Sequence, residues 1–157
     1  MGLIAALAAV IFVADLVTKY VALGRLRPGV PVPVVDGFFS LTLVMNPGLA
    51  FGMLGDVPES FRWMVGLLSV GALVVLAVLA ARVLPGGGRW SQLALGLVFG
   101  GAAGNLVDRV RFGAVVDFLD FYWRAYHWPA FNVADSAISV GVTLLALRML
   151  VETPAKA

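Results

Sequence analysis

The stretch FNVADSAISVGVTLLAL, residues 131–147, decides the fold class of this chain. It is apolar enough to form most of a membrane-spanning helix, which needs about 20 residues. It nevertheless carries Asp135 close to its start. A carboxylate entering lipid costs roughly 2.5–3.5 kcal/mol on insertion scales, so an acid at this place is expected to have a purpose. The stretch predicts a membrane helix with either a capping acid or a functional acid at its boundary.

The composition of the whole chain agrees with a membrane protein. Of its 157 residues, 61% are hydrophobic and only 13% are charged, whereas a soluble domain needs a more polar surface. The net charge of +2 is too small to suggest a nucleic-acid partner. The absence of cysteine excludes disulfides, a thiol nucleophile and thiolate metal sites. A single histidine, His127, does not make a metal centre by itself, so no metal or cofactor is expected.

Hydrophobic segments predict an all-α membrane protein with one domain over residues 1–157. Four spans are expected, at about 3–23, 62–83, 91–107 and 133–151. An even number of spans places the two long connections, 24–61 and 108–132, on one side and both termini on the other. More Lys and Arg lie on the side of the long connections, which by the positive-inside rule favours the cytoplasm for them.

The long connections and the third span have distinct patterns. Residues 28–55 combine prolines, a β-prone run and a turn at Asn46-Pro47-Gly48, which predicts a small β-cradle at the membrane surface. Residues 110–131, VRFGAVVDFLDFYWRAYHWPAF, are rich in aromatics and predict an interfacial loop with His127 as an anchor. In the third span Gly96, Gly100 and Gly104 form a small-residue stripe that favours close helix packing.

Polar residues gather near the span ends, and each group also has a purely structural interpretation. Asp15 and Lys19 share a helix face and can form a simple ion pair. The motif GNLVDR brings three polar side chains to the end of the third span, where they can also anchor that helix; they are Asn105, Asp108 and Arg109. Asn132 and Asp135 have the spacing of a capping box.

Asp117 lies within the apolar run VVDFLDF. A purely solvating role is harder to assign to it, because Asp120 can supply a solvated side chain in the same segment. Together with Asp135, Asp117 suggests a two-carboxylate site. Two close carboxyl groups share one proton near neutral pH. The ionised group can then activate water while the protonated group polarises a peptide carbonyl. This chemistry fits hydrolysis at the membrane surface, and it also fits a proton relay in a small proton-coupled carrier. The spans hold few ionisable groups away from their ends, which favours hydrolysis.

Five motifs in order make the chain resemble the lipoprotein signal peptidases (signal peptidase II), a bacterial family of membrane aspartyl peptidases. The motifs are DLVTK (15–19), NPGLAFG (46–52), GNLVDR (104–109), VVDF (115–118) and FNVADSAI (131–138). The resemblance implies four transmembrane helices with cytoplasmic termini, and it places the β-cradle and the long connections on the outer face of the bacterial inner membrane. This orientation is the reverse of the one that the positive-inside rule favours. The resemblance also implies removal of the signal peptide from diacylglyceryl prolipoproteins, just before the lipidated cysteine. Membrane lipid and these precursors are the expected partners, and a monomer is the default expectation for the oligomeric state.

The resemblance further implies roles for individual residues. The family's catalytic aspartates fall on Asp117 and Asp135, and its supporting asparagines on Asn105 and Asn132. Arg109 matches the arginine that orients the substrate backbone. The positions that match bracing residues of the site are Asp15, Lys19 and Asp108. Those that match the cradle closing over substrate are Asn46, Gly48, Ala50 and Phe51.

Overall fold

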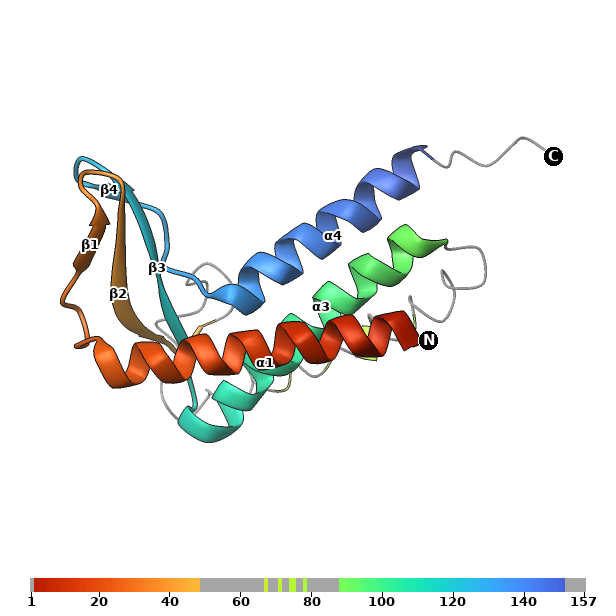
Figure 1. The fold of residues 1–157 in the computed structure, drawn as a ribbon, viewed down its shortest axis with the longest axis horizontal. Helices are drawn as coiled ribbons and strands as arrows, with labels where there is room; N and C mark the ends of the chain where they lie inside the picture. The colour runs from red at the N-terminus through yellow and green to blue at the C-terminus, as the bar shows by residue number, and fades with distance from the viewer. Residues whose placement is uncertain are drawn as a thin grey trace.

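The computed structural model describes residues 2–48, 67, 71, 74, 75, 78 and 88–151. These residues contain three long helices and a four-stranded antiparallel sheet (Figure 1). The helices are α1 (Gly2–Arg25), α3 (Arg89–Phe112) and α4 (Val133–Val151). The strands are β1 (Val32–Val35), β2 (Phe39–Asn46), β3 (Val115–Trp123) and β4 (Tyr126–His127), in that spatial order. Most of the expected second span, 62–83, and the end of the expected cradle, 49–55, lie outside the described residues.

The glycine stripe of the third span forms helix contacts, as predicted. α3 lies between α1 and α4 and packs against both. A Cβ at Gly100 would lie 2.6 Å from the carbonyl oxygen of Ala8 on α1. Gly101 is not part of the predicted stripe and faces α4, where a Cβ would lie 2.5 Å from the carbonyl oxygen of Ala134. Because no side chain fits at these distances, glycine allows both neighbouring backbones to approach α3 closely.

α3 is longer than the expected span of 91–107. It continues to Phe112 and is followed by Gly113, whose φ of 66° is the left-handed conformation that favours glycine at a helix end. The Gly113 N–H donates to the carbonyl oxygen of Arg109 at 3.0 Å. The polar residues of the GNLVDR motif therefore all lie on regular helix.

The surfaces of the helices are apolar where they are exposed. Among the described residues, α1 and α3 are each long and apolar enough to cross a membrane. Large apolar side chains stand exposed along α1 and α4, as expected for helices that face lipid; they include Val10, Val13, Val17, Val21, Val140 and Leu147. The four-span arrangement itself stays a prediction, because most of residues 62–83 is not described.

The expectation that residues 110–131 form an interfacial loop was wrong in its secondary structure, because this connection contributes strands to the sheet beyond the expected cradle. Residues Val115–Trp123 form β3, which pairs along its length with β2 and carries the short strand β4 at its far end. The pattern was ambiguous because an apolar, aromatic run suits a strand as well as an interfacial segment. The sheet lies at the end of the helices opposite the start of α1 and the end of α4 (Figure 1).

Candidate active site

The start of α4 is held by the predicted capping box. Asn132 Oδ1 accepts a hydrogen bond from the backbone N–H of Asp135 at 2.9 Å. Asp135 Oδ2 in turn accepts from the backbone N–H of Asn132 at 3.3 Å. This reciprocal pair satisfies two N–H groups at the helix start and holds the Asp135 carboxylate in a fixed direction.

Asp117 projects from β3 toward the same helix start. Its Oδ1 accepts from Asn132 Nδ2 at 2.7 Å, and its Oδ2 accepts from Asn46 Nδ2 at 3.0 Å. Burial, followed by the nearby charge of Asp135, raises the pKa of Asp117 from 3.8 to about 7, while the hydrogen bonds from Asn46 and Asn132 act to lower the pKa. One asparagine, Asn132, thus touches both aspartates that the sequence predicted as a pair.

Asn105 links this pair to a buried cation. Its Oδ1 accepts from Lys19 Nζ at 2.9 Å and from Asn132 Nδ2 at 3.1 Å, and its Nδ2 donates to Asp135 Oδ1 at 2.7 Å. Lysine has only donors, so the oxygen of the Asn105 amide must face Lys19 and its NH₂ group must face Asp135. Lys19 therefore determines which way the Asn105 amide points.

Lys19 is 2% exposed and lies between two carboxylates, which are Asp15 on α1 and Asp108 on α3. Each N–O distance is 2.7 Å. The simple Asp15–Lys19 pair foreseen from the sequence is therefore part of a larger cluster. Such a buried charge group is tolerated only where its oxygens and protons find partners.

The two carboxylates of this cluster also bind the backbone beside the two candidate catalytic residues. Asp15 Oδ1 accepts from the N–H of Ala134, the residue before Asp135, at 2.9 Å. Asp108 Oδ2 accepts from the N–H of Val116, the residue before Asp117, at 3.1 Å. Each aspartate of the pair is thus positioned by a different carboxylate of the Lys19 cluster. Asp15 acts on the peptide before Asp135, and Asp108 acts on the peptide before Asp117.

Arg109 reaches across from α3 to the chain that follows β2. Its Nη2 donates to the carbonyl oxygen of Gly48 at 2.8 Å, and its Nη1 lies 3.4 Å from the carbonyl oxygen of Asn105. The guanidinium also interacts electrostatically with Asp135 and Asp117. Two further predicted cradle residues, Ala50 and Phe51, lie outside the described part of the chain.

Each of the other predicted site residues lies in one connected network. Its members come from α1, α3, α4, β2 and β3, from the turn after β2, and from Asn132 directly before α4. The arrangement offers one buried carboxyl group with a high pKa, a second carboxylate at a helix start, and amides that orient both. Within residues 2–48 and 88–151 no group of three or more His, Asp or Glu side chains has the arrangement of a metal site. The sequence interpretation missed Asp120, which is buried and bound by Ser40, Thr42 and His127 instead of being solvated. Its partners on β2 are far away in sequence, and no local signal points to them.

Comparison with known proteins identifies close relatives. Residues 7–151 match the family described as Signal peptidase (SPase) II. The lipoprotein signal peptidase of Geobacter sulfurreducens is 53% identical over 126 residues, which cover 80% of this chain and 78% of the relative. That of Syntrophus aciditrophicus is 43% identical over 147 residues, covering 91% and 89%. A solved bacterial membrane enzyme, 28% identical, superimposes with a TM-score of 0.79 over 99% of this chain and 96% of its own.

Proposed function

Because the chain belongs to the signal peptidase II family and removes signal peptides from prolipoproteins, we propose that it does so as an aspartyl endopeptidase with Asp117 and Asp135 as its catalytic pair. Family membership over most of the chain favours this function over the proton-coupled carrier considered from the sequence. The observation that carries the proposal is the position of Asn132, which donates to Asp117 through its side chain and to Asp135 through its backbone. This brings two carboxyl groups to one place at the end of the helices.

The two carboxyl groups are proposed to have different roles. Asp117 is assigned the shared proton, since its pKa of about 7 leaves it half protonated near pH 7 and largely protonated below that pH. Asp135 acts as the carboxylate, because it accepts hydrogen bonds from Asn105 and Asn132 and lies in the field of Arg109 and Lys19. Asp135 takes a proton from water as the water oxygen attacks the scissile carbonyl. Asp117 hydrogen-bonds the carbonyl oxygen, and its proton goes to the leaving amine as the C–N bond breaks.

The remaining residues support this pair. Asn46, Asn105 and Asn132 direct the carboxyl groups, and the cluster of Asp15, Lys19 and Asp108 holds the peptides beside them. Arg109 is assigned to the substrate backbone, and the cradle residues Gly48, Ala50 and Phe51 to closure over it. The contact of Arg109 with the Gly48 carbonyl supports a shared surface for the arginine and the cradle.

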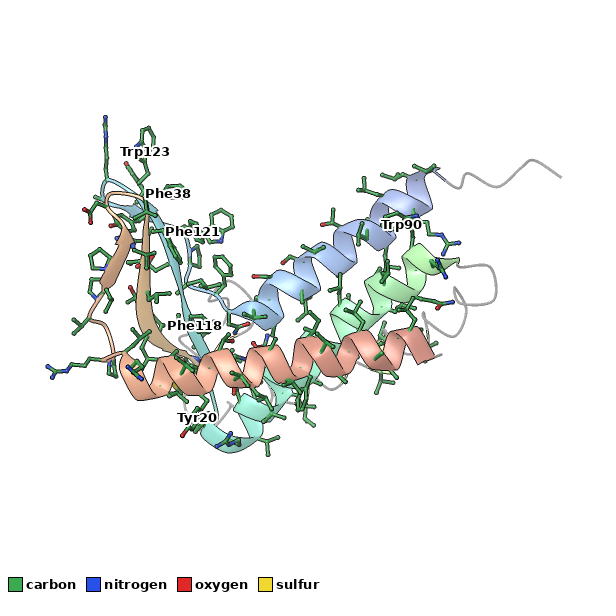
Figure 2. All side chains as sticks on the ribbon, viewed as in Figure 1. Tyr20, Phe38, Trp90, Phe118, Phe121 and Trp123 are labelled. Atoms are coloured by element: carbon green, nitrogen blue, oxygen red, sulfur yellow. The ribbon has the colours of Figure 1, made fainter. Side chains whose placement is uncertain are left out.

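We further propose four transmembrane helices, with both termini in the cytoplasm and the sheet at the outer face of the bacterial inner membrane. The chain is an integral membrane protein by family and by its apolar helices. The start of α1 and the end of α4 lie at the same end of the molecule, opposite the sheet (Figure 1). Exposed aromatic residues occupy both ends of the molecule, with Phe38 in the turn between β1 and β2, Trp123 at the end of β3, and Trp90 at the start of α3 (Figure 2). Aromatic side chains at two levels are typical of the two membrane interfaces.

Acyl chains in the bilayer would hold a lipidated substrate at the membrane boundary, beside the sheet end of the helices. The scissile bond of this substrate lies before a diacylglyceryl cysteine and therefore near the headgroups, where the helix ends carry their acids. Membrane lipid and the lipidated precursor are the expected partners, and a monomer is the expected state. A precursor without its lipid should be cleaved poorly in a gel assay, and equal cleavage of both forms would contradict presentation by the bilayer.

The decisive experiment compares purified variants on a diacylglyceryl prolipoprotein, with signal-peptide release followed on gels. Asp117→Asn and Asp135→Asn are each expected to lower release to background, because an amide neither activates water nor carries the shared proton. Asp36→Asn is the matched control, because it makes the same chemical change at a distance from the pair. Asp36 is exposed in the turn between β1 and β2. Substantial release by either dyad variant, in folded protein, would exclude the assigned pair.

A further inference from the structure

A second polar cluster lies on the face of the sheet opposite Asp117. Its centre is Asp120 on β3, which is 6% exposed. Asp120 Oδ2 accepts from Ser40 Oγ at 3.2 Å and from Thr42 Oγ1 at 3.0 Å, both on β2. Asp120 Oδ1 lies 2.9 Å from His127 Nδ1 on β4. None of these four residues takes part in the catalytic network described above.

The pairing of β2 with β3 changes register beside this cluster. Leu41 lies opposite Leu119, but the next paired residues are Val44 and Asp117. Two residues of β2, Thr42 and Leu43, therefore lie opposite the single residue Phe118, which makes a β-bulge in β2.

The bulge decides which face of the sheet Asn46 occupies. Directly paired residues of antiparallel strands share a face, and Asn46 is paired with Val115. Val115 and Asp117 are two residues apart on one strand, so Asn46 shares the face of Asp117 and reaches its carboxyl group at 3.0 Å. Without the extra residue in β2, Asn46 would point to the opposite face, because a shift of one residue reverses every side chain.

The two halves of β2 are held differently around the bulge. Before it, Phe39 stacks on Phe121 with ring centroids 4.6 Å apart, which keeps this half in its register. After it, the backbone pairing continues from Val44 to Asn46, and the described side-chain hydrogen bond to β3 is the one from Asn46 to Asp117. The bulge residue Thr42 is fixed by its hydroxyl on Asp120, and Leu43 by its carbonyl oxygen, which accepts from the Gly29 N–H at 3.0 Å. The half of β2 that carries Asn46 therefore has fewer described side-chain contacts to β3, and we expect it to be the half that shifts if Thr42 is released.

We propose that Asp120 is a positioning residue of the peptidase: it fixes the β2 bulge through Ser40 and Thr42 and thereby holds Asn46 against Asp117. The proposal rests on the proposed function, because it assigns Asp120 an effect on a carboxyl group taken to be catalytic. Asp120 acts from the far face of the sheet and does not contact the reacting groups.

The effect should be visible in the pH dependence of cleavage. The groups that act on the charge of Asp117 are Asp135 on α4, Lys19 on α1 and the amides of Asn46 and Asn132, with Arg109 on α3 nearby. None of these except Asn46 lies on β2. Loss of the Asn46 hydrogen bond removes an influence that lowers the pKa of Asp117, so the alkaline limb of kcat/KM should move to higher pH. A shift of roughly one pH unit is expected for one hydrogen bond to a carboxylate.

The experiment measures kcat/KM against pH for purified full-length variants on the lipidated precursor. Asn46→Ala sets the size of the shift. Asp120→Ala and Thr42→Val are expected to move the alkaline limb in the same direction, and the double variant Asn46→Ala/Asp120→Ala no further than Asn46→Ala alone. Asp120→Asn should keep the alkaline limb at its wild-type pH, because the amide oxygen of asparagine can still accept from the hydroxyls of Ser40 and Thr42. His127→Gln should leave the limb in place, which also excludes histidine as its source.

The outcomes separate this inference from the proposed function. A limb unchanged in both Asp120→Ala and Thr42→Val, or unchanged in Asn46→Ala itself, would overturn the positioning role even if Asp117→Asn abolishes cleavage. An active Asp117→Asn variant would overturn the catalytic assignment instead. If Asp120→Ala does not fold, Thr42→Val decides the matter, since it removes one hydroxyl and keeps the branched shape of the side chain.

Discussion

The carboxylate of Asp15 on α1 accepts a hydrogen bond from the backbone N–H of Ala134 on α4, at 2.9 Å. A side chain of the first helix therefore caps the last one, next to Asp135. The capping box alone leaves this N–H without a partner, because Asn132 Oδ1 is used by the N–H of Asp135. The N–H groups at the start of α4 are therefore capped both by the adjacent Asn132 and by Asp15 of α1, which is far away in sequence.

Asp15→Ala is expected to lower both stability and activity. It removes the cap and leaves Lys19 with one carboxylate fewer, and breaking a buried ion pair costs about 3–5 kcal/mol. Cleavage should fall at least about tenfold, since small displacements of a catalytic group are costly. Asp15→Asn keeps an acceptor for Ala134 and should lose less activity than Asp15→Ala. Thermal unfolding in detergent and the gel assay measure the two effects, and equal activity of both variants would contradict a capping role.

Substitutions of Asn132 should separate capping from catalysis. Asn132→Ala removes the cap, at about 1 kcal/mol, together with the hydrogen bond to Asp117. Asn132→Ser restores a good capping side chain but is too short to reach Asp117. We expect Ser to recover most of the thermal stability while cleavage stays about a hundredfold below wild type, in the range of a lost orienting group. Recovery of cleavage along with stability would mean that Asn132 acts only as a cap.

Cleavage should decline as pH rises above about 7, where Asp117 loses the shared proton. Its raised pKa also predicts a trend in stability. Between pH 3.8 and about 7 the folded protein binds more protons at Asp117 than the unfolded chain does, so stability falls as pH rises through this window. Asp117→Asn should flatten that part of the stability curve. The measurements are a pH profile of kcat/KM and thermal unfolding at several pH values; an alkaline limb well above pH 8 would contradict the assignment.

Alanine in place of Gly100 should destabilise the protein without touching the site. The added methyl would lie 2.6 Å from the Ala8 carbonyl oxygen and 2.8 Å from Ile11 Cβ, so α1 must move away from α3. Such overpacking costs about 1–3 kcal/mol. Gly24→Ala is the matched control: it is also helical but has no neighbour within 4 Å, and alanine there should stabilise α1 by about 0.5–1 kcal/mol. Unfolding temperatures that move alike in the two variants would contradict close packing at Gly100.

Sequence reasoning succeeded where the interaction is local. The capping box of Asn132 and Asp135 and the pairing of Asp15 with Lys19 each depend on spacing within one helix, and both are present. The packing of the glycine stripe was also predicted, because it follows from helix periodicity. The five motifs identified the family correctly.

It failed where residues far apart in sequence determine the structure. β3 was taken for an interfacial loop because its partner strand, β2, is separated from it by a long stretch of chain. Asp120 was assigned to solvent for the same reason, since Ser40 and Thr42 are 80 and 78 residues away. A bulge that places one asparagine on the correct face leaves no pattern in a single sequence.

The side-chain amides of Asn105 and Asn132 are each held in one orientation. An ammonium group that can only donate orients the Asn105 amide, and a backbone N–H that can only donate orients the Asn132 amide. Neither amide can flip without breaking a hydrogen bond to a group that can only donate. The dipoles around the two carboxyl groups are therefore already set before a precursor arrives. Charge that develops during hydrolysis meets an environment that has little left to reorganise, which is the condition under which electrostatic stabilisation of a transition state is most effective.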